Sequence, residues 1–190
     1  MALAFIAPGQ GAQFVGMGME LAKSYPQSRS VFEEVDDALG ENLSDLIWYG
    51  SIEDLTLTEN AQPALMATTL AVFRALQSEG LKLSDAKFVA GHSLGEYSAL
   101  AMAESLSISD AAKLLRIRGR AMQNAVPVGV GAMAAILGLP YTDLVEITKQ
   151  AAINGVCQAA NDNDPSQVVV SGHKGAVERA IEIAKEAGAK

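Results

Sequence analysis

Apolar and polar positions along the chain alternate between two kinds of spacing, which predicts an α/β protein. Two short, mainly apolar stretches, LAFIA at residues 3–7 and KFVA at residues 87–90, predict strands. Helical spacing and glycine or polar punctuation predict four helices between them, over residues 18–25, 29–39, 43–48 and 61–77. Pro63 is expected in the first turn of the last of these helices. Strands that alternate with helices imply parallel neighbours joined by right-handed crossovers.

The pattern changes at residues 126–131, where the segment VPVGVG indicates a connection between two parts of the chain. Before it, Ser107 and Asp110 have the spacing of a capping box for a helix that ends near residue 124. After it, strands and helices are predicted in the order β-α-β-β-α, over residues 132–137, 141–151, 156–160, 167–171 and 174–186. That order lacks only a last strand to be ferredoxin-like. We therefore expect a larger part, residues 1–126, and a smaller part, residues 127–190.

Composition predicts a soluble protein with a substantial core. Of the 190 residues, 49% are apolar and 19% are charged. No basic segment precedes the first apolar run and no apolar stretch is long enough to cross a bilayer, so we expect a cytoplasmic protein with no membrane partner. The single cysteine, Cys157, suits a reducing compartment and is expected to be buried in a strand. The formal net charge of −8 argues against a nucleic-acid partner.

The most informative motif is GHSLG at residues 91–95, which places Ser93 between two glycines, after a strand and before an apolar helix. A nucleophile elbow has this arrangement, because its sharp turn exposes the serine hydroxyl and its crowded backbone tolerates little beyond glycine at the flanking positions. The first amides of the following helix would face a developing oxyanion. A purely structural turn is the alternative for Ser93.

A second glycine-rich turn, PGQG at residues 8–11, follows the first strand. Its glycines let the backbone of Gln10 approach another group closely, and the Gln10 N–H is a candidate second oxyanion donor. An ordinary loop or a phosphate-binding turn is the alternative. The glycines do not have the G-x-G-x-x-G spacing, and no Gly-Lys-Ser/Thr follows, so neither nucleotide-binding motif is matched.

Four segments together resemble one family: PGQGAQ near the amino terminus, GHSLGEYSAL in the middle, LLRIRGRAMQNAVP at 114–127 and GAMAAILGL at 131–139. They are similar, in order and spacing, to the malonyl-CoA:acyl-carrier-protein transacylases of bacterial fatty-acid synthesis. The resemblance covers all 190 residues. It implies a hydrolase-like parallel sheet with flanking helices and an inserted ferredoxin-like small subdomain. It also implies that both are incomplete here, because the family's catalytic histidine and later strands come from a segment after position 190.

The resemblance assigns roles to five residues. Ser93 corresponds to the nucleophile, and the backbone N–H groups of Gln10 and Leu94 correspond to the oxyanion hole. Arg118 matches the arginine that binds the free carboxylate of the malonyl group, which a planar guanidinium can hold bidentately. A helix-surface arginine is the alternative. Asn161 corresponds to an asparagine at the edge of the active site, with a turn residue as the alternative.

Neither histidine of the chain is an obvious base for the serine. His92 is adjacent to it, so its side chain is expected to leave the turn in another direction and to have a structural role. His173 is expected to cap a helix or lie on the surface. The resemblance agrees that neither is the catalytic histidine.

Three basic residues are spaced to share one helix face, namely Lys113, Arg116 and Arg120. An acidic carrier protein would need such a local basic patch to overcome the repulsion from the net charge of −8. This face is therefore a candidate docking surface, with a simple solvated face as the alternative.

The elbow indicates acyl transfer through a serine, and the resemblance implies a malonyltransferase, in fatty acid biosynthesis, that moves a malonyl group from coenzyme A to the phosphopantetheine thiol of acyl carrier protein through a malonyl-serine intermediate. No metal and no redox cofactor are expected. The expected partners are malonyl-CoA, acyl carrier protein and the remaining carboxy-terminal segment of the same enzyme. Two other functions stay open. An α/β serine hydrolase, such as an esterase or thioesterase, would use the same elbow, and a non-catalytic carrier-protein docking module would keep only the fold.

Overall fold

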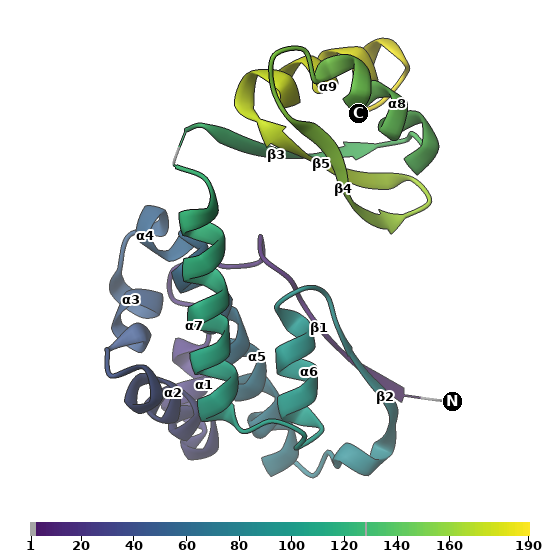
Figure 1. Cartoon of the computed structure of the whole chain (residues 1–190). Coiled ribbons are helices and arrows are strands. Elements are labelled where there is room, and N and C mark those ends of the chain that lie inside the picture. The colour runs from purple at the N-terminus through teal and green to yellow at the C-terminus, as the bar shows by residue number, and fades with distance from the viewer. Residues whose placement is uncertain (1–2, 128) are drawn as a thin grey trace. The chain divides into compact units, whose positions relative to one another are not determined.

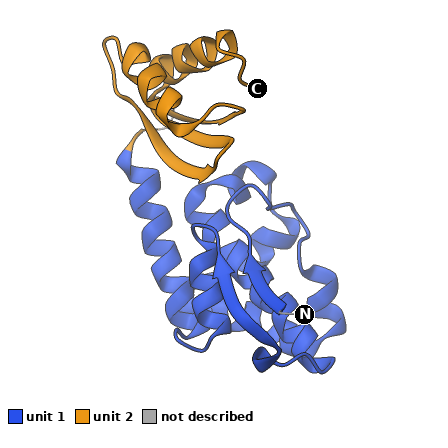
Figure 2. Cartoon of the chain, turned by 90° about the vertical axis from the view of Figure 1, so that its right-hand side faces the viewer, with its two compact units in different colours: residues 1–125 blue, residues 126–190 orange. Residues whose placement is uncertain are grey.

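The computed structural model of the chain describes residues 3–127 and 129–190. The chain separates into two compact units, Met1–Ala125 and Val126–Lys190, coloured separately in Figure 2. Each unit has its own cluster of buried apolar side chains. Figure 1 shows the elements in chain order. Val128, which belongs to the expected connection, lies outside the described residues.

The sheet of the first unit pairs two strands that are distant in sequence. Strand β1 (Leu3–Ala7) lies parallel to β2 (Ala86–Gly91), with Ala7 opposite Gly91. Both strands and their parallel pairing agree with the prediction from the apolar runs. Because the register aligns their last residues, the PGQG turn and the GHSLG turn leave the sheet at the same carboxyl edge. In open α/β sheets this edge is where ligands bind.

Helices pack around this sheet and supply most of the buried core. In chain order they are α1 (Met19–Ser24), α2 (Pro26–Leu39), α3 (Leu43–Tyr49), α4 (Ile52–Thr56), α5 (Thr58–Ser78), a short 3₁₀ turn η1 (Leu83–Asp85), α6 (Gly95–Met102) and α7 (Ile108–Ala125). The expected cap of α7 is present, because the Asp110 N–H donates to Ser107 Oγ at 3.0 Å. Helix α4 was not predicted from the sequence pattern.

Helix α5 begins earlier than expected, and the prediction that Pro63 lies in its first turn is wrong. The helix starts at Thr58, so Pro63 lies inside it. Proline has no N–H, which leaves the carbonyl oxygen four residues earlier without its helical donor. That carbonyl belongs to Glu59, and Arg116 Nη1 donates to it at 2.5 Å. A side chain from α7 thus replaces the missing backbone hydrogen bond.

The burial of Arg116 shows that the predicted basic face of Lys113, Arg116 and Arg120 is wrong. Arg116 is buried, with 5% of its surface exposed, and it pairs with Glu41. Burial, assisted by the nearby charge of Arg120, lowers the pKa of Arg116 to about 10. Lys113 is exposed, and Arg120 pairs with Glu59 at 3.3 Å. The three residues therefore do not form one exposed basic face, because the middle one packs between α7 and α5.

The second unit has the predicted β-α-β-β-α order. Its elements are β3 (Gly131–Leu137), α8 (Tyr141–Ala151), β4 (Cys157–Asp164), β5 (Gln167–His173) and α9 (Lys174–Glu186). The strands are antiparallel in the order β3-β5-β4, and α8 and α9 pack side by side on this sheet (Figure 1). Strand β4 runs four residues beyond its expected end at residue 160.

Two backbone contacts complete this unit. Lys190 and Leu137 exchange hydrogen bonds of 2.9 Å in both directions, so the chain's last residue pairs with β3. Cys157 is buried at the start of β4, as expected, and burial raises the pKa of its thiol above the ordinary value.

Within residues 3–127 and 129–190, no helix is both long and apolar enough to cross a membrane.

Candidate active site

The turn between β2 and α6 has the geometry of a nucleophile elbow. Ser93 has a φ of 56°, in the left-handed region that non-glycine residues rarely adopt. A Cβ atom at Gly91 would lie 2.0 Å from the backbone of Gly95, and one at Gly95 would lie 2.5 Å from the carbonyl oxygen of Ala7. Both positions therefore require glycine, because neighbouring backbone occupies the space of a side chain. Ser93 itself is exposed.

The PGQG turn lies directly beside this elbow. The His92 N–H donates to the carbonyl oxygen of Ala7 at 3.1 Å, which ties the elbow to the end of β1. A Cβ atom at Gly9 would lie 2.5 Å from Nδ1 of His92, so the imidazole packs against the backbone of this turn. His92 therefore has a contact with the neighbouring loop, consistent with the expected structural role.

The backbone N–H groups at the start of α6 form a tight first turn directly after Ser93. The N–H groups of Gly95, Glu96 and Tyr97 donate to the carbonyls three residues earlier, at 2.9, 3.1 and 3.1 Å. Leu94 precedes this run as the N-cap residue, with its side chain 1% exposed. A buried side chain holds its backbone at the amino end of the helix, where the partial positive charge favours an anion.

Arg118 reaches the serine from α7. Its Nη2 donates to Ser93 Oγ at 3.0 Å, and its Nη1 donates to Oε1 of Gln62. Residues 25 positions apart in the sequence therefore meet at the elbow. The guanidinium places a permanent positive charge beside the hydroxyl oxygen, which favours negative charge developing there. Arg118 thus has defined partners, unlike a surface arginine.

Two further residues were not found by sequence reasoning. Gln62 is fully buried on α5, and its Nε2 donates to Thr58 Oγ1 at 2.9 Å. The Thr58 hydroxyl donates to Oε1 of Gln10 at 2.8 Å. A signal did exist, because Gln62 interrupts the apolar stretch AQPALMA, where a polar side chain needs a partner.

The remaining predicted residues belong to the second unit. Asn161 is exposed in β4, next to an irregularity in the pairing with β5, so it lies in a strand rather than in a simple turn. Its assignment to the edge of the active site stays a prediction. His173 is the N-cap residue of α9, and its Nδ1 accepts a hydrogen bond from the Val156 N–H at 2.8 Å. That contact is structural.

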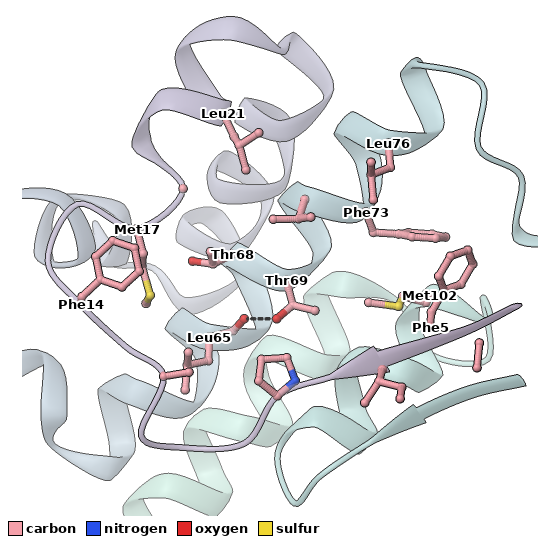
Figure 3. Close-up of a pocket in the computed structure, with 16 residues that line it drawn as sticks. Phe5, Phe14, Met17, Leu21, Leu65, Thr68, Thr69, Phe73, Leu76 and Met102 are labelled. Atoms are coloured by element: carbon pink, nitrogen blue, oxygen red, sulfur yellow. Dashed lines mark hydrogen bonds between the residues drawn. The ribbon is translucent and has the colours of Figure 1, made fainter. Parts of the chain in front are cut away.

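An apolar pocket is lined by residues of β1, of the loop that follows it and of α5, as Figure 3 shows. Its cavity is about 560 Å³, and Ser93, Arg118 and Gln62 are not among its lining residues. Phe5, Phe14, Phe73 and other apolar side chains line it.

Among the residues that the structure describes, no group of three His, Cys, Asp or Glu side chains is arranged to bind a metal.

Curated proteins are similar to this chain over nearly its whole length. The chain is 49% identical over 189 residues to the malonyl CoA-acyl carrier protein transacylase of Bacillus subtilis, covering 99% of this chain and 59% of that protein. It is 46% identical over 187 residues to the Escherichia coli K12 protein of the same name, covering 98% of this chain and 60% of that protein. The chain therefore spans about 60% of the length of these relatives.

Solved structures agree with the fold. The crystal structure of acyl-carrier-protein-S-malonyltransferase from Bartonella henselae superposes with a TM-score of 0.93 at 55% identity, covering 100% of this chain and 61% of that one. The corresponding transacylase from Coxiella burnetii gives a TM-score of 0.92 at 43% identity, with 100% and 60% covered. These matches confirm the predicted α/β fold and the resemblance. Residues 4–190 match the family described as acyl transferase domain, and the chain belongs to that family.

Proposed function

We propose that the protein transfers a malonyl group from coenzyme A to the phosphopantetheine thiol of acyl carrier protein, in fatty acid biosynthesis. The observation that supports this most is the 3.0 Å contact between Arg118 Nη2 and Ser93 Oγ. An acyl group attached to Ser93 Oγ starts within hydrogen-bond distance of a guanidinium. A malonyl ester ends in a carboxylate, and a guanidinium is the side chain best suited to bind it bidentately.

The proposed reaction has two steps. Ser93 Oγ attacks the thioester carbonyl carbon of malonyl-CoA, its proton passes to a base, and the C–S bond breaks to release coenzyme A as the thiol. The carrier-protein thiol then gives its proton to the base and attacks the carbonyl carbon of the malonyl ester, the C–O bond breaks, and the base passes that proton to Ser93 Oγ. The backbone N–H groups of Gln10 and Leu94 are the proposed donors to the oxyanion, each worth roughly 10²–10³ in kcat. Neither step uses a metal or a redox cofactor.

The base for Ser93 is proposed to be a histidine from a further carboxy-terminal segment of the same enzyme. His92 packs against Gly9, and His173 accepts from a backbone N–H in the second unit, so both have other contacts. The relatives are longer than this chain, which leaves length for such a segment. Asn161 is proposed to lie at the edge of the same site. We also propose a cytoplasmic location, which suits the single free cysteine.

Two other functions are less well supported. A simple serine hydrolase would use the elbow but has no need for a guanidinium hydrogen-bonded to Ser93 Oγ. A docking module without chemistry would have no need for the left-handed backbone of Ser93, which carries strain.

The test asks whether the malonyl group is transferred to the carrier protein or to water. The full-length protein is incubated with malonyl-CoA and phosphopantetheinylated acyl carrier protein, and malonyl-carrier protein and free malonate are both measured. We expect malonyl-carrier protein to form faster than malonate by orders of magnitude. Malonate as the main product would support the hydrolase, and no turnover of malonyl-CoA would support the docking module.

A further inference from the structure

Thr58 and Gln62, at the start of α5, connect the PGQG turn to Arg118. Thr58 Oγ1 donates to Gln10 Oε1 at 2.8 Å and accepts from Gln62 Nε2 at 2.9 Å. Gln62 Oε1 accepts from Arg118 Nη1. The glutamine is 0% exposed, and the only other partner of its Nε2 within the described part of the chain is Met122 Sδ, a weak acceptor at 3.3 Å. Thr58 is therefore the main acceptor for a buried amide.

The direction of each hydrogen bond in this series follows from the arginine. A guanidinium only donates, so Gln62 turns its carbonyl oxygen toward Arg118 and its amide nitrogen toward Thr58. The Thr58 hydroxyl accepts from that nitrogen, which leaves its single proton for Gln10. A hydroxyl is the smallest side-chain group that both accepts and donates in this way. A methyl group in its place would leave the Gln62 amide facing an apolar atom, which is unfavourable in a buried position.

These hydrogen bonds also determine which terminal nitrogen of Arg118 faces Ser93. Gln62 holds Nη1, and Nη2 is directed at Ser93 Oγ. An arginine side chain has many rotamers, and ordering it before the acyl group arrives removes an entropic loss from the reaction. If Gln62 were free to rotate its amide, it could present N–H groups to the guanidinium, and the two donors would repel each other.

We propose that Thr58 is a positioning residue for Arg118: acting through Gln62, its hydroxyl holds the guanidinium in the orientation that receives the carboxylate of an acyl group on Ser93. This inference rests on the proposed malonyl transfer. It makes acyl selectivity depend on a residue whose hydroxyl, within the part of the chain that the structure describes, bonds to Gln10 and Gln62 and not to Ser93 or Arg118. The loss of the hydroxyl should therefore affect a donor with a carboxylate more than a donor without one.

The experiment compares Thr58→Val, Thr58→Ser and Thr69→Val in the full-length protein, with malonyl-CoA and acetyl-CoA as donors. We expect Thr58→Val to lower kcat/KM for malonyl-CoA by about 5- to 20-fold and to lower that for acetyl-CoA by clearly less. Thr58→Ser keeps the hydroxyl and should recover most of the wild-type selectivity. Thr69 is the matched control on α5, because its hydroxyl donates to Leu65 O in its own helix at 2.7 Å (Figure 3). Thr69→Val should leave both donors unchanged.

Thermal unfolding of the same samples separates positioning from folding. A lower Tm with an unchanged ratio of malonyl to acetyl transfer would overturn the proposal, and so would equal losses for the two donors. If Thr58→Val does not fold, Thr58→Ala removes the hydroxyl with a residue that favours helix, and the same ratio applies. A wild-type protein that transfers no malonyl group would refute the proposed function and this inference with it. Normal wild-type transfer with unaltered selectivity in the variant would refute this inference alone.

Discussion

Arg118 lies on α7 and Ser93 lies in the turn between β2 and α6, and we propose that their contact selects the acyl group. The guanidinium lies 3.0 Å from the serine hydroxyl, and Gln62 holds its other terminal nitrogen. A carboxylate on the acyl group would gain a charge-assisted hydrogen bond that an acetyl group cannot make. Such bonds are worth about 1.5–3 kcal/mol, which is roughly 10- to 150-fold in rate.

Arg118→Ala should therefore change acyl preference more than stability. In the full-length protein we expect malonyl transfer to fall by roughly 10- to 150-fold, with acetyl transfer spared or relatively favoured. Steady-state kinetics with both coenzyme A esters measures this. Arg120→Ala is the control, since Arg120 lies on the same helix and is exposed. Equal losses for the two donors in Arg118→Ala would show that the arginine does not bind the carboxylate.

The sequence motifs predicted part of this site. GHSLG predicted an elbow at Ser93, because few backbone arrangements need glycine on both sides of a serine. Arg118 was predicted only through the resemblance, since spacing on a helix does not show what lies opposite. Gln62 and Thr58 were missed because their hydrogen bonds depend on how α5 approaches the PGQG turn and α7, which is a property of tertiary packing.

Helices α5 and α7 pack closely where the arginine must be placed. A Cβ atom at Gly119 would lie 2.5 Å from Cα of Glu59, so the backbones nearly touch at this point. One residue earlier, Arg118 turns toward Ser93, and Arg116 is buried against α5. Arg116 donates to the Glu59 carbonyl that Pro63 leaves without a donor. The two helices therefore set the position of the guanidinium in the site.

Arg116→Met should destabilise the protein by about 1–3 kcal/mol, because it leaves a part-buried carbonyl and the partly exposed carboxylate of Glu41 without their partner. Urea unfolding of the full-length protein measures the change. Lys113→Met, on the exposed part of α7, should change stability by less than about 0.5 kcal/mol.

A second substitution tests whether Arg116→Met loses stability because the Glu59 carbonyl loses its hydrogen-bond donor. Pro63→Ala restores a backbone N–H that can donate to the Glu59 carbonyl. In the Arg116→Met background it should recover part of the lost stability. Strictly additive effects of the two substitutions would contradict the proposed replacement of the helical hydrogen bond.

Sequence pattern predicted some elements well and others poorly for physical reasons. The bounds of α8 and α9 match the prediction, because each has a clear apolar face. Helix α4 has five residues, too few for a periodic pattern, and Ser51 caps it by accepting from the Asp54 N–H at 3.0 Å. The start of α5 was placed too late because a proline usually marks the first turn of a helix. Here Pro63 lies inside the helix, and Arg116 donates the hydrogen bond to the Glu59 carbonyl that the proline cannot donate.

The first unit exposes apolar side chains on its sheet and in the loop that follows β1. Ile6 on β1 is 78% exposed and Phe88 on β2 is 69% exposed. Phe14, which lines the apolar pocket of Figure 3, is 61% exposed. Large exposed apolar groups close together mark surfaces that other polypeptide covers. The proposed carboxy-terminal segment would have this surface available to pack against.

Residues 1–190 expressed alone should therefore associate and should not transfer malonyl groups at an ordinary enzymatic rate. The apolar surface favours association, and loss of the base for a serine removes most of the rate beyond that from oxyanion donors and binding. Light scattering and a malonyl-transfer assay measure both properties, before and after the segment that follows in the full-length protein is added in trans. A stable monomer with full activity would refute the need for that segment, and His92 would then be the first alternative base to test.

The proposed transfer depends on a malonyl-serine intermediate, which the intact mass of the full-length protein after brief exposure to malonyl-CoA would reveal. We expect one malonyl adduct on the wild type, located on Ser93 by peptide mapping, and none on Ser93→Ala. Ser98→Ala is the control, since Ser98 is buried on α6 and its hydroxyl has no hydrogen-bond partner among the described residues. It should keep the adduct. An adduct that persists on Ser93→Ala, or the absence of an adduct from the wild type, would show that Ser93 is not the nucleophile.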